Sequence, residues 1–128
     1  MMGAPVTRPI QKVTITNTIA TTPAGLAVAG TGANGPCAFY GATDLARLNS
    51  CTETPYRFFA NALVGASSTW PAGNMFPGSP LDVGFANYHG ANGGDYHILS
   101  GPLKNAATDG TALGADVDRV AQATAGVL

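Results

Sequence analysis

The sequence predicts a single domain with an all-β fold, either a coiled solenoid or a sandwich of short strands. Apolar and β-branched residues alternate in short segments separated by turns, and no long helical pattern lies between these segments. The 17 Gly and 9 Pro residues lower helix propensity and multiply turns. The hydrophobic fraction of 45% and the net charge of −1 argue against disorder. At 128 residues, the chain has room for one core.

The first predicted strand covers residues 13–19 (VTITNTI), where β-branched residues alternate with a period of two. Asn17 shares the apolar face of this strand. In a coiled solenoid, an inward asparagine stacks on the asparagines of neighbouring coils and bonds to the backbone of those coils. The alternative is that Asn17 is a solvent-exposed turn residue. After a Thr-Thr-Pro turn, residues 25–30 (GLAVAG) predict a second strand.

A long irregular excursion follows as far as Pro55, with one helical turn predicted at residues 44–48 (DLARL). It contains both cysteines, Cys37 and Cys51. A disulfide between them is reasonable if the parent protein is secreted, whereas cytosolic expression would leave two thiols. Neither cysteine has a CxxC partner or a nearby His, which argues against zinc and redox roles.

Alternation of apolar residues predicts three further strands, at residues 57–65, 81–85 and 95–99. Residues 116–126 predict a helix with acidic residues in its first turn, a narrow apolar stripe and Gly126 as its end. So narrow a stripe suits a helix that covers an edge better than a helix that builds a core.

Composition excludes several classes of partner. Charged residues are sparse, with 6 Lys plus Arg against 7 Asp plus Glu. Nucleic acids and anionic membrane surfaces require clustered positive charge, so neither is expected to bind. No apolar run approaches the roughly 18 residues needed to cross a bilayer. The start, MMGAPVTRPIQ, lacks the apolar stretch of a secretion signal.

One candidate catalytic group consists of His89, Asp95 and His97, which include the only histidines. Two His and a carboxylate could hold a divalent metal that activates water to attack an ester, a lactone or a glycoside. The alternative is that Asp95 and His97 lie in solvent, with Asp95 capping the preceding Gly-Gly turn.

A second candidate metal site consists of Asp109, Asp116 and Asp118, whose oxygens could form a cage for Ca²⁺. The alternative is an Asx turn at Asp109 and ordinary acidic residues at the start of a helix. Trp70 and Tyr88 are candidates for stacking on sugar rings. For Trp70 the alternative is an anchor of its own loop.

The last part of the chain contains four distinctive segments: residues 93–99 (GGDYHIL), 101–106 (GPLKNA), 108–110 (TDG) and 114–118 (GADVD). Together they resemble the closing segment of right-handed parallel β-helix proteins, the pectate-lyase-like superfamily of bacterial secreted proteins. The similarity extends upstream through residues 13–19, 61–65, 70–77 and 83–85. It therefore covers most of the chain.

The resemblance implies that residues 1–128 form the C-terminal end of a right-handed parallel β-helix, with about three coils, long loops and a C-terminal capping helix. The active groove of that family lies along middle coils, which are absent here. Ala112 stands where an acidic residue is usual, which weakens an ion site near Asp109. The expected function is a structural module of a secreted, carbohydrate-associated protein that contacts polysaccharide without a complete active site.

Two alternatives remain open at this point. One is a small hydrolase that depends on Ca²⁺ or Zn²⁺ and uses the candidate metal sites. The other is a self-assembling structural protein, because the tail caps only one end of the stack and the edge near residues 13–19 would present unpaired N–H and C=O groups. That edge predicts a homo-oligomer, unless a partner chain or the Cys37-to-Pro55 excursion covers it.

Overall fold

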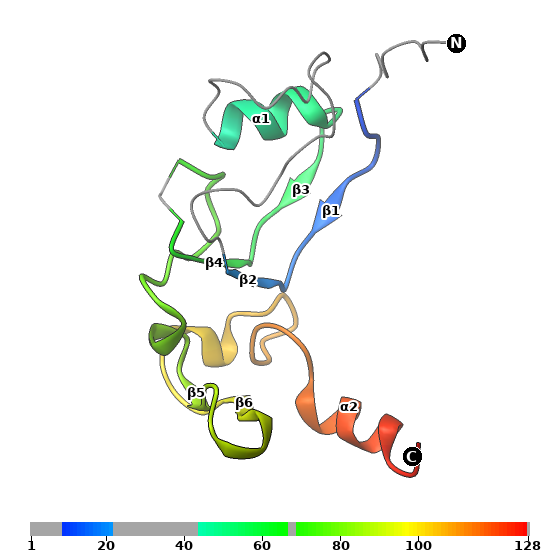
Figure 1. Ribbon diagram of the computed structural model, residues 1–128. Helices are drawn as coiled ribbons and strands as arrows, with labels where there is room; N and C mark the ends of the chain where they lie inside the picture. The colour runs from blue at the N-terminus through cyan, green and yellow to red at the C-terminus, as the bar shows by residue number, and fades with distance from the viewer. Residues whose placement is uncertain (1–8, 22–43, 67–68, 128) are drawn as a thin grey trace, which may run out of the picture.

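The computed structural model describes residues 9–21, 44–66 and 69–127, and these residues form a mixed α/β fold (Figure 1). The described strands are short and lie in three separate two-stranded sheets. In this part of the chain no sheet closes and no coil is completed, so the predicted all-β solenoid with three coils is wrong. None of the described helices is long and apolar enough to cross a membrane.

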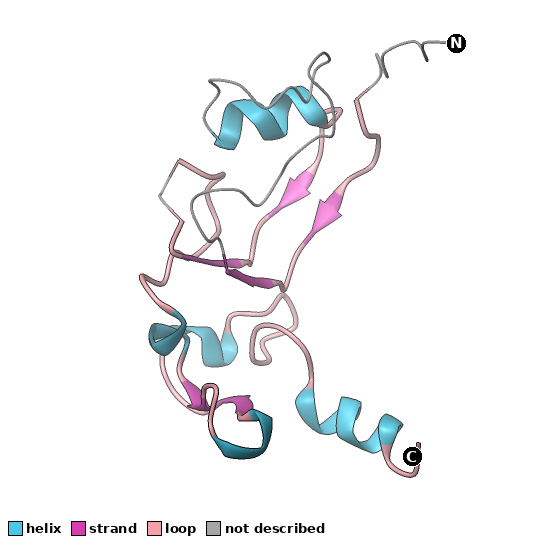
Figure 2. Ribbon diagram, in the orientation of Figure 1, coloured by secondary structure: helices cyan, strands magenta, loops and turns pink. Residues whose placement is uncertain are grey.

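Two parallel strand pairs form the first half of the fold (Figure 2). Strand β1 (Thr14–Ile15) pairs with β3 (Arg57–Phe58), and β2 (Ile19–Thr21) pairs with β4 (Ala62–Val64). The predicted strand 57–65 therefore supplies two short strands, whereas the predicted strand 13–19 contains β1 and only the first residue of β2. We call residues 13–21 the first pass and residues 57–65 the second pass.

A bend separates the two strands of each pass. Asn17 and Ala60 have positive φ angles of 57° and 52°, in the left-handed region where an extended strand cannot continue. The two residues lie side by side, because the backbone N–H of Asn17 donates to the carbonyl oxygen of Ala60 at 2.8 Å. Both passes thus turn at the same place, and β1–β3 and β2–β4 run in different directions (Figure 1).

A third pass, residues 73–77, lies on the other side of the second pass. The N–H of Met75 donates to the carbonyl of Asn61 at 2.8 Å, and the N–H of Leu63 donates to the carbonyl of Met75 at 2.9 Å. The pairing is again parallel, with Ala62 opposite Met75. The second pass is therefore paired on both sides, whereas the first pass is an edge.

Helix α1 (Asp44–Cys51) extends the helical turn that the sequence predicts at residues 44–48. It ends at Cys51, which is disulfide-bonded, and Cys37 is the only other cysteine of the chain. Cys37 and the predicted strand 25–30 lie outside the described residues.

The second half of the fold contains an antiparallel hairpin of β5 (Phe85–Asn87) and β6 (Asp95–Ile98). A 3₁₀ turn, η2 (Ala91–Gly93), connects them, and Gly93 and Gly94 take left-handed φ angles of 92° and 87° that reverse the chain. This reversal is the physical reason why the solenoid prediction fails here, since a solenoid would add another parallel strand.

The predicted strand 81–85 is also wrong over most of its length. A 3₁₀ helix, η1 (Pro80–Val83), occupies it, and only its last residue joins β5. Ser79 and Asp82 form a capping box, and proline at the first helical position fixes a suitable φ angle. The local helix signals outweigh the alternation of apolar residues.

The chain ends in a further 3₁₀ helix, η3 (Pro102–Asn105), and in α2 (Val117–Thr124). Helix α2 lies within the predicted range 116–126 and begins at the predicted acidic residues, with Asp116 as its N-cap. No residue of α2 is buried, so this helix projects from the fold and does not cover an end of the stack as predicted.

Two hydrophobic clusters cover the two faces of β4. One face contributes Ala62 and Val64 to a cluster that also contains Val83, Ile98, Leu103 and Leu113. The other face contributes Leu63 to a cluster with Leu48, Phe58 and Trp70. A short parallel strand buried on both faces is expected to be apolar throughout, as β4 is.

Candidate functional site

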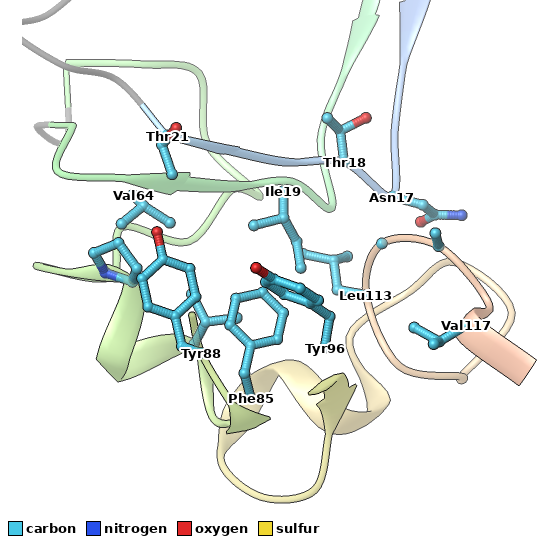
Figure 3. A pocket seen from close by; sticks show the side chains of 14 residues that line it. Asn17, Thr18, Ile19, Thr21, Val64, Phe85, Tyr88, Tyr96, Leu113 and Val117 are labelled. Carbon is cyan, nitrogen blue, oxygen red and sulfur yellow. The ribbon is translucent and has the colours of Figure 1, made fainter. Parts of the chain in front are cut away.

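A cavity of about 600 Å³ lies between β2 and the β5–β6 hairpin (Figure 3). This size is typical of pockets for small molecules, which measure roughly 300–1,000 Å³. Its wall is mostly aliphatic and aromatic, and no charged residue lines it. The lining consists of Asn17, Thr18, Ile19, Thr21, Val64, Pro80, Val83, Phe85, Tyr88, Tyr96, Leu113, Gly114, Ala115 and Val117.

Three aromatic rings from the hairpin form one side of the cavity. The rings of Phe85 and Tyr88 are nearly parallel, at 12° with centroids 5.8 Å apart. The ring of Tyr96 stands edge-on to both, at 79° to Phe85 and 89° to Tyr88. Such edge-to-face pairs stabilise the cluster beyond the burial of their surface. The wall that they form is a corner with two perpendicular faces.

The hydroxyl groups of Tyr88 and Tyr96 point from the hairpin toward β2 (Figure 3). Within the described part of the chain, neither hydroxyl has a hydrogen-bond partner. Tyr88 is half-buried and Tyr96 is exposed, so water can reach this side of the cavity and hydrate hydroxyls that have no protein partner. The cavity therefore offers two polar groups at an apolar wall.

Two glycines make this geometry possible. Gly94 has φ +87°, and a Cβ atom there would lie 2.7 Å from the carbonyl oxygen of Asn87, inside the hairpin. Gly114 has φ +95°, and a Cβ atom there would lie 3.1 Å from the side chain of Ile19. The second glycine thus brings the loop before α2 against β2, where it forms part of the cavity wall.

Beside the cavity, the imidazole ring of His97 lies between two carboxylates. Nδ1 of His97 is 2.5 Å from Oδ1 of Asp95, and Nε2 is 3.2 Å from Oδ1 of Asp118. The hydrogen bonds that the imidazole donates to Asp95, and to a smaller extent to Asp118, raise the pKa of His97. The hydrogen bonds from the His97 backbone and side chain lower the pKa of Asp95. The arrangement connects β6 to α2.

The structure brings together only two of the predicted catalytic residues. Asp95 and His97 are in contact, but His89 packs edge-on against the ring of Tyr88, with centroids 4.2 Å apart. Both ring nitrogens of His97 already face carboxylates. Among the described residues, no three His, Cys, Asp or Glu side chains are placed to hold a metal ion.

The three predicted calcium ligands have separate local roles, although all three border a second, shallower hollow. Asp109 accepts hydrogen bonds from the backbone and hydroxyl of Thr111, which lower the pKa of Asp109. Asp116 caps α2 by accepting from the N–H of Arg119, and Asp118 faces His97. These contacts match the alternative that the sequence left open, an Asx turn and helix N-terminal acids.

The two predicted sugar-stacking residues differ in their placement. Trp70 is 4% exposed and stacks on Phe58 with centroids 5.3 Å apart, so its ring is part of the core and unavailable to a ligand. Tyr88 lines the cavity. Phe85 is a site residue that the sequence does not indicate, because its alternation with Val83 is typical of an ordinary core position.

The outer side of the first pass is a second candidate site, which we call the open edge (residues 14–21). Its other side pairs with the second pass, and no described strand pairs with the open edge. Its sequence, TITNTIAT, contains no charged residue, no Pro and no Gly. Edge strands of natural proteins often carry charged residues or Pro as protection against pairing with other chains.

Comparisons of this chain with protein-family models, with curated proteins and with solved structures give no match. The resemblance of residues 93–118 and of the upstream segments to parallel β-helix proteins accordingly stays a prediction that rests on the sequence alone.

Proposed function

We propose that this protein is a structural module that associates with a second copy of itself through the open edge and has no complete active site of its own. The observation that carries the proposal is the absence of charge, Pro and Gly from residues 14–21, an edge that is unpaired among the described strands.

Backbone groups of the open edge supply the binding energy. Toward the second pass, the carbonyls of Val13 and Thr18 accept hydrogen bonds from Arg57 and Ala62 at 2.9 Å each. Successive residues of a strand point their N–H and C=O groups alternately to the two sides. Ile15 and Asn17 also bond toward the second pass, so alternation directs the backbone groups of Thr14, Thr16, Ile19 and Thr21 outward. The carbonyl of Thr16 already accepts from the Thr18 hydroxyl, and the other outward groups can bond to an added strand.

A second copy suits this edge better than a charged partner. Threonine alternates with apolar residues along most of the edge, and Thr–Thr and β-branched pairs across strands are favourable. The net charge of −1 opposes association only weakly. A two-fold axis through the bend at Asn17 pairs the edges in antiparallel orientation, with β1 of one copy beside β2 of the other.

Substitutions at Thr14 test the proposal, because this exposed residue lies in β1 at the edge. Thr14→Lys places two like charges at the interface and is expected to weaken association by about tenfold or more. Thr14→Val keeps the β-branched shape and is expected to leave association unchanged. Thr124→Lys, on exposed α2, controls for the added charge. Sedimentation equilibrium measures the association constant of each variant.

A wild-type chain that stays monomeric at every concentration would refute the proposal. So would equal association of wild type and Thr14→Lys. The metal-dependent hydrolase is a weaker alternative, because both ring nitrogens of His97 face carboxylates. Loss of any measured hydrolysis on addition of EDTA would favour it.

A further inference from the structure

We propose that the cavity between β2 and the β5–β6 hairpin binds a small neutral ligand with a six-membered ring, whose face is apolar and whose edge carries hydroxyl groups. The cavity shares β2 with the open edge, but a ligand would contact side chains of the cavity wall whereas a second copy would bond to backbone groups of the edge, so the inference does not depend on self-association. It follows from the charge, the shape and the polar groups of the cavity wall.

The ligand is neutral because the cavity wall carries no charged side chain. None of the residues that line the cavity is an Asp, Glu, Lys, Arg or His. A charged ligand would lose hydration on entering, and no opposite charge would compensate for that loss. An apolar surface, in contrast, gains free energy when it leaves water for this wall.

The ring shape follows from the aromatic corner. Tyr96 stands at 89° to Tyr88, so a flat ring that stacks on one of them meets the edge of the other. Aromatic faces bind the apolar C–H face of a ring in this way. On the opposite side, Ile19 and Leu113 offer aliphatic surface to the second face of the ligand (Figure 3).

The hydroxyl groups of the ligand follow from the two tyrosine hydroxyls that point into the cavity. Each can donate one hydrogen bond and accept others. Within the described residues they have no protein partner, and Tyr96 is 37% exposed, so a ligand hydroxyl that bonds to them takes the place of water. Thr18 and Thr21 add further hydroxyl groups to the wall near β2.

Two sources fit this chemistry: the pyranose ring of a carbohydrate and the ring of a phenol. Methyl β-glucopyranoside and p-cresol are therefore titrated separately, and the shifts of the tyrosine ring protons are followed by NMR. The Thr14→Lys variant is titrated in parallel with the wild type. If the two proteins bind a probe equally, ligand binding in the cavity does not require self-association. Failure of the self-association proposal would then leave ligand binding intact, and the two proposals can be judged separately.

Three variants assign the binding to the cavity. Tyr88→Phe and Tyr96→Phe keep the rings and remove the hydroxyls, and each is expected to weaken binding about fivefold. Tyr56→Phe is the matched control, because its hydroxyl bonds to Asn49 at 2.6 Å outside the cavity. Ala115→Trp fills the cavity from an exposed position and is expected to abolish binding.

Saturable shifts with either probe, reduced by the tyrosine variants, support the proposal and identify the source of the ring. The proposal is overturned if neither probe produces saturable shifts. It is equally overturned if a probe binds but Ala115→Trp and Tyr88→Phe bind it as the wild type does.

Discussion

The side-chain amide of Asn61 donates a hydrogen bond of 2.9 Å to the side-chain oxygen of Asn74, in the interior of the three passes. Asn61 is fully buried, and its other bonds reach the first pass: Nδ2 to the carbonyl of Ile15 at 3.0 Å and Oδ1 from the N–H of Thr18 at 3.1 Å. Asn74 repeats this pattern toward the second pass, with bonds to Phe58 and to the N–H of Asn61. The two asparagines thus connect all three passes.

We expect Asn61→Leu to lower the free energy of unfolding by about 3 kcal/mol, because leucine leaves the partly buried carbonyl of Ile15 and N–H of Thr18 without their partner and removes the side-chain bond to Asn74. Urea denaturation followed by Trp70 fluorescence measures the change, since Trp70 is buried. Asn105→Ala, at an exposed asparagine, is the control and should change stability by less than about 0.5 kcal/mol. A loss as small as the control would show that Asn61 does not connect the passes.

The contacts of His97 predict a dependence of stability on pH. Because the pKa of His97 is raised in the folded state, its contribution is fully present below the unfolded value of about 6.5 and is lost as the pH rises through the folded value. The lowered pKa of Asp95 adds a contribution that is present above the ordinary carboxyl range and lost as the pH falls through the folded value. Stability should therefore decline on both sides of a mildly acidic maximum.

Two variants test the cause of this dependence. Asp95→Asn is expected to lower the pKa of His97 more than Asp118→Asn does, because Asp95 makes the larger contribution. NMR titration of the His97 ring measures both. An unchanged pKa of His97 in Asp95→Asn would contradict the assignment, and His97→Gln should remove the decline of stability above neutral pH.

Gly84 and Gly110 form a matched pair for testing close packing. Both have positive φ angles, +84° and +80°, but a Cβ atom at Gly84 would lie 2.4 Å from the carbonyl oxygen of Ser100, whereas at Gly110 it would meet nothing within 4 Å. We expect Gly110→Ala to cost about 1 kcal/mol and Gly84→Ala about 3 kcal/mol. Thermal unfolding of the two variants measures both changes. Equal losses of unfolding free energy would show that the backbone at Ser100 moves away from the added Cβ atom at little cost.

The N-cap of α2 is expected to stabilise that helix alone. Asp116→Ala removes the acceptor for the N–H of Arg119 and should destabilise α2 by about 1 kcal/mol. Because no residue of α2 is buried, the core should be unaffected. Hydrogen exchange of individual amides separates the two effects. Gln122→Ala, within the same helix, is the control, and faster exchange in β4 would contradict the prediction.

Sequence reasoning located several short elements but not their pairing. The period of two in residues 13–19 marks strand structure correctly, yet it does not encode which partner a strand takes or in which direction. Parallel pairing of the first two passes agrees with the expectation, whereas the β5–β6 hairpin is antiparallel because the Gly-rich turn between the two strands reverses the chain.

The candidate site was predictable only in fragments. The role expected of Asn17, stacking with asparagines of neighbouring passes, belongs instead to Asn61 and Asn74, because Asn17 takes a left-handed conformation and bonds to Thr108. The sequence indicates Tyr88, but the opposite wall of the cavity comes from β2 and the loop before α2, whose proximity to the hairpin no local pattern reveals. The helix cap at Asp116, in contrast, depends on adjacent residues and was found.

The alignment of the passes constrains how this sequence can vary. Ile19, Ala62 and Met75 occupy equivalent positions, so one residue inserted within a pass would shift every later side chain to the opposite face. The connections between passes carry no such restriction. Relatives of this chain should therefore differ freely in overall length while preserving the tetrads Asn-Ala-Leu-Val and Asn-Met-Phe-Pro, and these spacings are what would reveal kinship.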